Sequence, residues 1–572
     1  MITIQEKISE KMPGITSLFL SFTYTPQYKD LVNIIKSSGD YWFDKDTKLW
    51  ELPVTNLSYL LDNLTFFDDI KLILHEDDKH SREQVKTTLD YELKPFPYQQ
   101  EGIEYGLNHD KWLLLDAPGL GKTKQIIHLA EELKAQKNLE HCLIICGINT
   151  LKTNWKKEIA KHSKLSAIIL GEKENSKNKV KYLSVTERAE QLKNDIEQFF
   201  IITNIETFRS EDVLKALKKS KNKIDMIVVD EVHKCKSHDS QQGKNLLKLK
   251  NAKYKVAATG TLLLNNPLDA YVPLKWIDVE RSNFTTFKNY YCKFGGPMGN
   301  QIIGFKNIET LKYQLAENSL RRTKDLLDLP PKTIINEIID MNDKHRKFYD
   351  DIVAGVKDEV DKVEITTSSL LAMVTRLRQA TACPSILTTS SIESSKIDRA
   401  VDLVEEILNG GEKVVIFSTF KETVRELENK LSKYNPVIAT GDTPDEEISK
   451  NIDLFQEDNE YKIFLGTWQK AGTGITLTKA NYMIFLDTPW TAGVFEQACD
   501  RIYRIGTKDP VFIYNLICKD TIDERVADIL DTKKAISDYM IDDKLSEDNF
   551  NILKDYIEQD SLDILKQYIQ EL

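Results

Sequence analysis

The sequence lacks the patterns that mark secreted, membrane-spanning and zinc-binding proteins. It has no uninterrupted apolar run of about 18 residues, and its first residues do not form the basic, apolar and small-residue pattern of a secretory signal. Its seven cysteines include no Cys-x-x-Cys pair, which argues against zinc modules and disulfide frameworks. We therefore expect a globular protein with buried thiols in a reducing compartment: cytoplasmic in a bacterial or viral source, or nuclear in a eukaryote, without a membrane partner.

The chain also lacks an excess of basic residues. Lys and Arg total 78 against 89 Asp and Glu, a formal charge of −11. Residues 538–572 alone carry ten acids and three lysines, a local charge of −7, so the remainder is closer to neutral. Nucleic-acid binding depends on the local field in a cleft rather than on this sum, so the composition does not exclude it.

The strongest motif lies in residues 113–123, where an apolar run leads into a glycine loop and a helix. Gly119 and Gly121 permit a tight turn whose N–H groups point inward. Such a loop binds a triphosphate through backbone amides and a lysine, and a hydroxyl at the helix start helps to hold Mg²⁺. Asp116 stands where the general pattern expects glycine. An amide such as Gln99, shortly upstream, suits an adenine edge. The predicted residues for ATP and Mg²⁺ are Gln99, Pro118, Gly119, Leu120, Gly121, Lys122 and Thr123.

A second apolar run, residues 226–229, delivers Asp230 and Glu231 to the end of a predicted central strand. Asp230 is expected to join Thr123 in the Mg²⁺ shell, and Glu231 to orient and deprotonate the attacking water. The next predicted strand ends in Thr259, Gly260 and Thr261, which suit a segment that senses the bound nucleotide. Another strand, residues 142–146, precedes a helix start whose polar groups suit nucleic-acid phosphates. Its predicted DNA contacts are Lys152, Asn154 and Trp155.

These motifs together carry a family resemblance. Asp-x-x-Gly-Leu-Gly-Lys-Thr, Asp-Glu-Val-His, Thr-Gly-Thr and the upstream Pro-Tyr-Gln resemble the first lobe of superfamily-two helicases of the Swi/Snf type, which are DNA-translocating ATPases. Residues 320–332 are similar to the link between the two lobes of that family, and residues 414–418, 465–474, 487–490 and 497–506 resemble motifs of its second lobe. The sequence departs from the family at Gly147, Leu262 and Thr507.

The resemblance implies further site residues in the second lobe. Arg501 and Arg504 are three apart, which predicts one helix face, and guanidinium groups are natural partners for a γ-phosphate developing charge. They are expected to complete the ATP site when the lobes close, with Gln497 contacting the nucleotide in the same cleft. The resemblance adds Gly472 and Gly474 as coupling residues and Thr467 and Trp490 as DNA contacts.

The predicted architecture is α/β, with two tandem RecA-like lobes, helical insertions and a small N-terminal α+β module. The expected boundaries are 1–90 for this module, 91–275 for the first lobe, 276–395 for a helical protrusion and link, 396–530 for the second lobe, and 531–572 for an acidic helical tail. In the N-terminal module, residues 41–52 predict a hairpin. Its Trp42 and Trp50 suit either a small core or a stacking platform for bases.

The expected function is ATP-driven translocation along duplex or branched DNA by a monomer. The hairpin is weakly similar to the HARP-like modules of annealing helicases, which act on forks and branched DNA. Two alternatives stay open: an RNA helicase of the same superfamily, and a DNA-binding subunit of a defence complex that needs a partner for activity.

Overall fold

The chain divides into two compact units, with the main boundary between Arg322 and Thr323. The first contains Met1–Asp116 and Gly121–Arg322, and the second contains Ala117–Leu120 and Thr323–Leu572. The predicted region 276–395 is therefore shared between the units. The computed structural model describes all residues except 1, 9–15, 23–27, 39–40, 54–55, 57–59, 61–62, 65–69, 74–84, 148, 175–179, 250–251, 261–266, 281, 296–300, 307, 361–366, 472–474, 490–491, 532–567 and 570–572.

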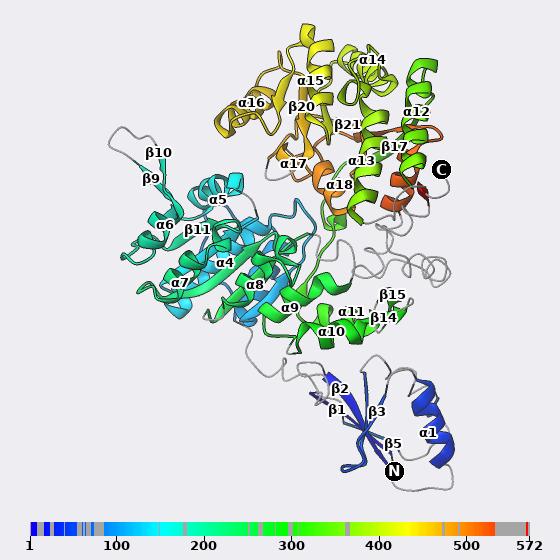
Figure 1. Ribbon diagram of the computed structural model, residues 1–572. Helices are drawn as coiled ribbons and strands as arrows, with labels where there is room; N and C mark the ends of the chain where they lie inside the picture. Colours follow the sequence, from blue (N-terminus) through cyan, green and yellow to red (C-terminus); the bar gives the residue numbers. More distant parts are fainter. Residues whose placement is uncertain are drawn as a thin grey trace. The chain divides into compact units, whose positions relative to one another are not determined.

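The described residues of the N-terminal module form a five-stranded sheet and the helix α1, in agreement with the predicted α+β module (Figure 1). Apolar residues alternate along its strands, and one face forms a core that includes Leu20, Leu52 and Trp50. The predicted hairpin is confirmed, because β3 and β4 pair antiparallel and Trp50 is buried in this core. The elements are β1 (Ile2–Ile8), β2 (Thr16–Phe22), α1 (Tyr28–Ser37), β3 (Trp42–Phe43), β4 (Trp50–Pro53) and β5 (Ile70–Ile73), in the sheet order β3-β4-β2-β1-β5.

A seven-stranded parallel sheet forms the centre of the next part of the chain. Its central strands are continuous apolar runs, which is expected where helices cover both faces of a parallel sheet. The sheet order is β16 (Ser319–Leu320), β6 (Lys111–Leu114), β13 (Tyr254–Ala258), β12 (Ile224–Asp230), β7 (His141–Cys146), β11 (Phe200–Asn204) and β8 (Ala167–Ile169). The predicted strands of the first lobe are thus confirmed, and Cys142 and Cys146 are buried thiols, as expected.

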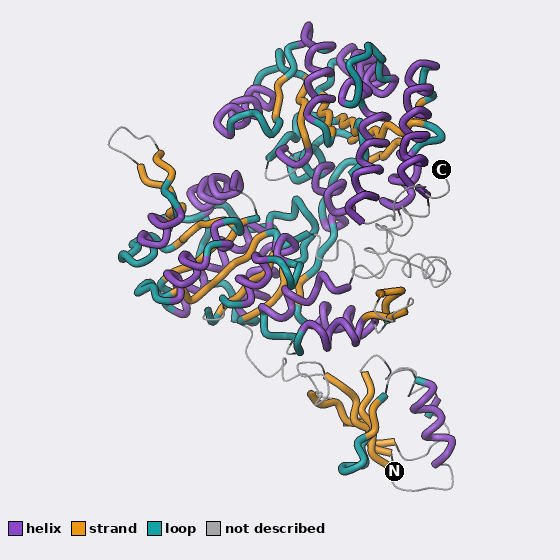
Figure 2. The backbone as a smooth tube through the Cα atoms, viewed as in Figure 1, coloured by secondary structure: helices purple, strands orange, loops and turns teal. Residues whose placement is uncertain are grey.

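Helices flank this sheet and extend into the predicted protrusion (Figure 2). The helices that accompany the sheet are α3 (Pro97–Asn108), α4 (Lys122–Lys137), α5 (Asn149–His162), α6 (Val185–Gln191), α7 (Glu211–Lys218) and α8 (Gln241–Leu247). The helix α9 (Tyr271–Trp276) ends where the predicted protrusion begins, and the protrusion contains α10 (Phe284–Tyr291) and α11 (Ile308–Glu317). The protrusion also holds a two-stranded sheet of β14 (Cys292–Gly295) and β15 (Gln301–Phe305). A second two-stranded sheet, of β9 (Glu172–Glu174) and β10 (Val180–Tyr182), lies earlier in the chain.

The second unit is built on a six-stranded parallel sheet. Its order is β17 (Lys332–Ile339), β22 (Val511–Cys518), β21 (Tyr482–Phe485), β18 (Val414–Ser418), β20 (Ile463–Thr467) and β19 (Val437–Ala439). Its helices are α12 (Asp343–Val360), α13 (Thr367–Ala382), α14 (Ser395–Asn409), α15 (Lys421–Lys430), α16 (Asp445–Glu457), α17 (Trp468–Ala471) and α18 (Ala492–Cys499). Two parallel sheets with helices match the predicted tandem RecA-like lobes. None of the helices in the described ranges is both long and apolar enough to span a membrane.

The end of the chain packs on the second unit. Ile569 is buried in a cluster with Tyr349 of α12 and Leu377 of α13, and the Arg525 guanidinium lies 5.6 Å from the centre of the Tyr568 ring. Residues 532–567 of the predicted acidic helical tail lie outside the described residues.

Within residues 85–91, three hydrogen-bond donors bind one buried carboxylate of α4. Glu132 accepts hydrogen bonds from the backbone N–H groups of Thr88 and Leu89, each at 2.9 Å, and from the Tyr91 hydroxyl at 2.9 Å. Burial acts to raise the pKa of Glu132, but these hydrogen bonds outweigh it and hold the pKa below its ordinary value. The ionised form is therefore the form that holds the segment.

Replacing Glu132 with alanine should loosen residues 88–91, whereas Val85 stays bound to Asn108. We expect the free energy of local opening to fall by about 2 kcal/mol at neutral pH, because hydrogen bonds to a charged acceptor are lost. Amide hydrogen exchange of Thr88 and Leu89 measures this change. Because the folded-state pKa is lowered, the difference from wild type should shrink as the pH falls through that pKa. Glu140→Ala, at a largely exposed side chain, is the control, and equal exchange in all three proteins would contradict the interpretation.

Candidate functional site

The glycine loop adopts the tight turn that the sequence predicts. Gly119 and Gly121 have φ values of 88° and 79°, in the left-handed region where a side chain is strained. A Cβ atom at Gly121 would lie 2.4 Å from Nε2 of Gln99, so a side chain there would displace Gln99 in addition to straining the backbone. Lys122 then begins α4. The loop thus has the conformation of a phosphate-binding loop at a helix N-terminus.

Gln99 lies beside this loop on α3. Its Oε1 accepts a hydrogen bond from the Phe96 N–H at 3.0 Å, and the side chain is buried. Pro97 begins the helix, where a missing N–H carries no cost. The structure therefore brings Gln99 next to Gly121, while its contact with adenine stays a prediction.

Parallel pairing places the two acidic residues at the same sheet edge as the loop. In the sheet, β13 lies between β6 and β12, and all three strands run in the same direction. Asp230 is the last residue of β12, and Glu231 follows it in a left-handed conformation with φ of 55°. The loop, Thr259 and the acidic pair therefore follow neighbouring strands at one edge, as Mg²⁺ and phosphate chemistry require.

Hydrogen bonds fix both carboxylate oxygens of Asp230. Oδ1 accepts from the Glu231 N–H at 3.0 Å, and Oδ2 accepts from Nε1 of Trp155 at 3.0 Å. Burial, together with the adjacent charge of Glu231, raises the pKa of Asp230 to about 6. A bound cation would favour the ionised form.

Glu231 is held in its ionised form by a neighbouring histidine and by lysine charges. Nδ1 of His233 lies 3.2 Å from Oε2 of Glu231 and 2.9 Å from Oγ1 of Thr259. Burial acts to raise the pKa of Glu231, but His233 and then Lys122 outweigh it and lower the pKa to about 2. At neutral pH this carboxylate is a hydrogen-bond acceptor, as the predicted water-orienting role requires. His233 links it to the predicted coupling residue Thr259.

The oxygen donors at this edge suit magnesium. Thr123 stands in the first turn of α4 and Asp230 ends β12, which gives one hydroxyl and one carboxylate. Mg²⁺ is bound in nucleotide sites by one or two such groups together with waters and substrate phosphates, not by an all-protein cage. Among the described residues, no cluster of three or more His, Cys, Asp or Glu could hold a metal.

The predicted DNA contacts of α5 are mostly buried. Trp155 is 1% exposed and donates to Asp230, and Lys152 is 3% exposed, with burial lowering its pKa. Asn154 is half-buried. Burial speaks against direct DNA contact by the indole and the ammonium, and we do not propose it for these two side chains. The motif that predicted a DNA contact instead supplies a hydrogen bond to the acidic pair.

The arginines of the second unit do not lie on a helix, which corrects the predicted helix face. The helix α18 ends at Cys499, and residues 500–504 form turns, here called the arginine turn. Nε of Arg501 donates to the Gln497 carbonyl at 2.8 Å, which folds the side chain back onto α18. Nη1 of Arg504 donates to Oγ1 of Thr476 at 2.9 Å. Their spacing fits a helix, but the backbone turns away after Cys499.

The remaining predicted residues lie at strand ends or outside the described residues. Gly260 follows β13, and its carbonyl accepts from Arg321 at 3.3 Å. Thr467 ends β20 and is 6% exposed, so little of its surface could meet DNA. Thr261, Gly472, Gly474 and Trp490 are among the residues that the structure does not describe.

Two functional candidates escaped the sequence analysis. His233 entered it only as part of the Asp-Glu-Val-His motif, although its position two residues after Glu231 suggests a contact. Arg322 entered it only as part of the link, yet its guanidinium binds the carboxylate of Asp116, with Nη2 2.6 Å from Oδ2. The sequence feature that could have revealed Arg322 is Asp116, which replaces a glycine of the general loop pattern. A buried carboxylate at that position needs a partner.

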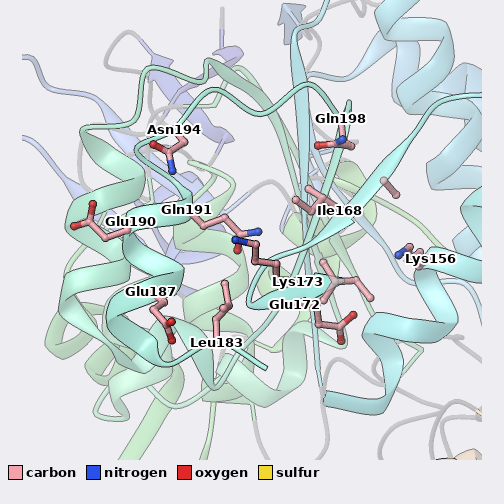
Figure 3. A pocket seen from close by; sticks show the side chains of 12 residues that line it. Lys156, Ile168, Glu172, Lys173, Leu183, Glu187, Glu190, Gln191, Asn194 and Gln198 are labelled. Atoms are coloured by element: carbon pink, nitrogen blue, oxygen red, sulfur yellow. The ribbon is translucent and has the colours of Figure 1, made fainter. Parts of the chain in front are cut away.

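A separate surface pocket of about 620 Å³ lies on the first unit (Figure 3). It is bordered by the edge strand β8 and by α6, and its lining includes Ile168, Lys173 and Gln191. None of the predicted nucleotide residues lines it, so it is distinct from the candidate ATP site.

Comparisons with known proteins agree with these motifs. The family described as SNF2-related domain matches residues 98–386, and that described as helicase conserved C-terminal domain matches residues 395–506. The first match alone covers more than half of the chain. Among solved structures, the chain resembles a Sulfolobus solfataricus SWI2/SNF2 ATPase core in complex with dsDNA, with a TM-score of 0.37, 24% identity, and coverage of 86% of this chain and 98% of that chain.

Curated relatives are similar over most of this chain. An uncharacterized ATP-dependent helicase of Mycoplasma genitalium is 27% identical over 77% of this chain and 41% of its own length. The DNA annealing helicase and endonuclease ZRANB3 of Bos taurus is 26% identical over 78% and 40%. The DNA repair and recombination protein RDH54 of Saccharomyces cerevisiae is 26% identical over 75% and 51%. The chain thus spans about half or less of the length of these relatives.

Replacing Trp155 with phenylalanine tests the hydrogen bond to Asp230. The variant keeps an aromatic ring in the core but loses the indole donor, so Asp230 is less well oriented. We expect ATP hydrolysis to fall about tenfold and the Mg²⁺ concentration for half-maximal activity to rise, because partners of metal ligands typically contribute this much.

The matched control is Trp112→Phe. Trp112 is equally buried in the same part of the chain, but its indole nitrogen has no hydrogen-bond partner among the described residues. The control should retain the wild-type Mg²⁺ dependence. If the two variants behaved alike, the loss would reflect packing and not the orientation of Asp230.

Proposed function

We propose that this chain, which belongs to the SNF2-related family of helicases, hydrolyses ATP to drive translocation along DNA. The observation that carries the proposal is the convergence at one sheet edge of a phosphate loop, an oriented carboxylate pair and a threonine that contacts the pair. The chemistry that fits is transfer of a γ-phosphoryl group to water.

In this proposal the phosphate loop and the adjoining edge of the seven-stranded sheet bind and position the nucleotide. The loop amides and Lys122 hold the phosphates, while Thr123 and Asp230 hold Mg²⁺, which neutralises phosphate charge when bound. Glu231 accepts a hydrogen bond from the attacking water and orients it in line with the γ-phosphate. Thr259, through His233, reports the state of Glu231 to the following segment.

The second unit supplies the arginine turn. Arg501 and Arg504 are proposed to stabilise charge on the γ-phosphoryl group, a contribution of about 10³ to 10⁵ in rate for arginines of this kind. Since they belong to a different unit from Glu231, hydrolysis depends on the arrangement of the two units. Repeated cycles of closure and opening would convert hydrolysis into steps along a DNA backbone.

DNA rather than RNA is the proposed substrate. The names of two of the relatives above describe proteins that act on DNA. Because this chain spans about half or less of their length, translocation, strand annealing and the preferred DNA structure remain proposals here. Seven buried free cysteines agree with a reducing compartment, and we propose a cytoplasmic location in a bacterial source.

Steady-state ATPase activity tests this function directly. The purified chain is assayed without nucleic acid and with duplex DNA, single strands, a branched fork or RNA. We expect DNA to stimulate hydrolysis, and Lys122→Ala to lower the stimulated rate by at least about 100-fold because a phosphate-binding cation is lost.

Lys137→Ala is the matched control, since Lys137 is an exposed lysine in the last turn of the same helix. It should retain full activity. Stimulation by RNA alone would identify an RNA helicase. Activity that appears only after a partner protein is added would instead identify a partner-dependent subunit.

A further inference from the structure

Arg322 holds the start of the phosphate loop through a buried ionic network. Its Nε and Nη2 lie 2.9 Å and 2.6 Å from the two carboxylate oxygens of Asp116, a bidentate arrangement. Nη2 also donates to Oε1 of Gln125 on α4 at 2.7 Å, and Nη1 donates to the Tyr98 carbonyl on α3. Asp116 is fully buried and Arg322 nearly so. One side chain thus ties together both helices and the loop that form the nucleotide site.

The effect of Arg322 reaches the predicted phosphate-binding lysine through Asp116. While the Asp116 carboxylate is bound by Arg322, its backbone carbonyl accepts a hydrogen bond from Nζ of Lys122 at 2.8 Å. Gly102 leaves room for the network, because a Cβ atom there would lie 2.0 Å from Oε1 of Gln125. A shift of Arg322 would therefore move the Asp116 carbonyl oxygen that accepts the hydrogen bond from Lys122.

Lys324, two residues later, is bound in the second unit to the arginine turn. Nζ of Lys324 donates to the Asp500 carboxylate and to the Tyr503 carbonyl, the latter at 2.7 Å, and it lies 4.7 Å from the centre of the Tyr503 ring. Lys332 adds a second attachment, with Nζ 3.0 Å from Oε2 of Glu496 on α18. Asp500 and Tyr503 lie on either side of Arg501 in the sequence. Lys324 and Lys332 therefore bind the segment that carries the predicted arginines.

Only Thr323 separates the two attachments. It is in an extended conformation, with φ of −98° and ψ of 169°, and one extended residue spans at most about 3.6 Å. The boundary between the two units falls at this residue. Arg322 and Lys324 are each held by a buried or half-buried ion pair, so only a short length of chain separates the two attachments.

We propose that Arg322 is a positioning residue for the phosphate loop and that Arg322, Thr323 and Lys324 form a short tether between that loop and the arginine turn. The tether makes the position of Lys122 dependent on the position of the segment around Arg501. The positioning of the loop stands on its own geometry, and the coupling to DNA-stimulated turnover rests on the proposed function.

The positioning role is tested by nucleotide affinity in the absence of DNA. Arg322→Lys keeps the positive charge but loses the bidentate fork, so we expect the Kd of a fluorescent ATP analogue to rise about tenfold. Asp116→Asn should have a similar effect, and the double variant should be no weaker than the weaker single variant, because both remove the same interaction.

Arg376→Lys is the matched control. Arg376 forms an equally bidentate pair with Glu359, with both N···O distances at 2.7 Å, but on the surface of the second unit. The Kd of the ATP analogue for the Arg376→Lys variant should equal that for wild type. If Arg322→Lys and Asp116→Asn also bound the analogue like wild type, even with a lowered Tm, the network would be only structural and the positioning role would be wrong.

The tether is tested by its length. Inserting two glycines after Thr323 leaves every named side chain in place but adds slack. We expect an unchanged Kd for the ATP analogue and a fall of about tenfold in stimulation by DNA, since misplacement of positioning groups by about 1 Å can cost this much or more. Full stimulation in the insertion variant would overturn the coupling.

The measurement of nucleotide affinity and the measurement of DNA stimulation together distinguish a failure of this inference from a failure of the proposed function. A wild-type chain that hydrolyses ATP without any response to DNA would contradict both the proposed function and the coupling. In that case the Kd comparison between Arg322→Lys and Arg376→Lys would still decide whether Arg322 positions the loop.

Discussion

The parallel pairing of β6, β13 and β12 is the constraint on which the nucleotide site depends. Parallel strands end at the same sheet edge, so segments that are far apart in the sequence emerge side by side there. The loop after β6, Thr259 after β13 and Asp230 at the end of β12 are neighbours for this reason. Their order in the sheet also explains why Thr259 contacts Glu231, since its strand lies between the other two.

Buried charge is the second feature that organises the site. Asp116 is fully buried and Asp230 and Glu231 are half-buried, and burial of a carboxylate is costly unless partners compensate for the lost hydration. Each has a specific partner: Arg322 for Asp116, Trp155 for Asp230 and His233 for Glu231. Arg322 and Trp155 are 206 and 75 residues away from their carboxylates, so the charges of Asp116 and Asp230 depend on the relative positions of separate segments, whereas His233 belongs to the same segment as Glu231. This is a physical basis for coupling nucleotide state to conformation.

The sequence predicted the elements with strong local patterns and missed those set by tertiary contacts. The strands around Cys142 and Asp230 were predictable from continuous apolar runs, and the glycine loop from the residues that its backbone requires. The helix expected over Arg501 and Arg504 was wrong, because spacing alone does not reveal that α18 ends at Cys499. Trp155 was expected to contact DNA, but its burial depends on packing between α5 and the sheet, which no local pattern records. Arg322 was visible only as a motif member, because its partner Asp116 is 206 residues away.

Triplex displacement tests the central claim of DNA translocation most directly. A third strand bound to duplex DNA is released when a motor moves along the duplex, without separation of the two duplex strands. The account predicts release that requires hydrolysable ATP. ATP hydrolysis that is stimulated by the same DNA but leaves the third strand bound would contradict translocation, and would show that the cycle of this chain drives a different rearrangement.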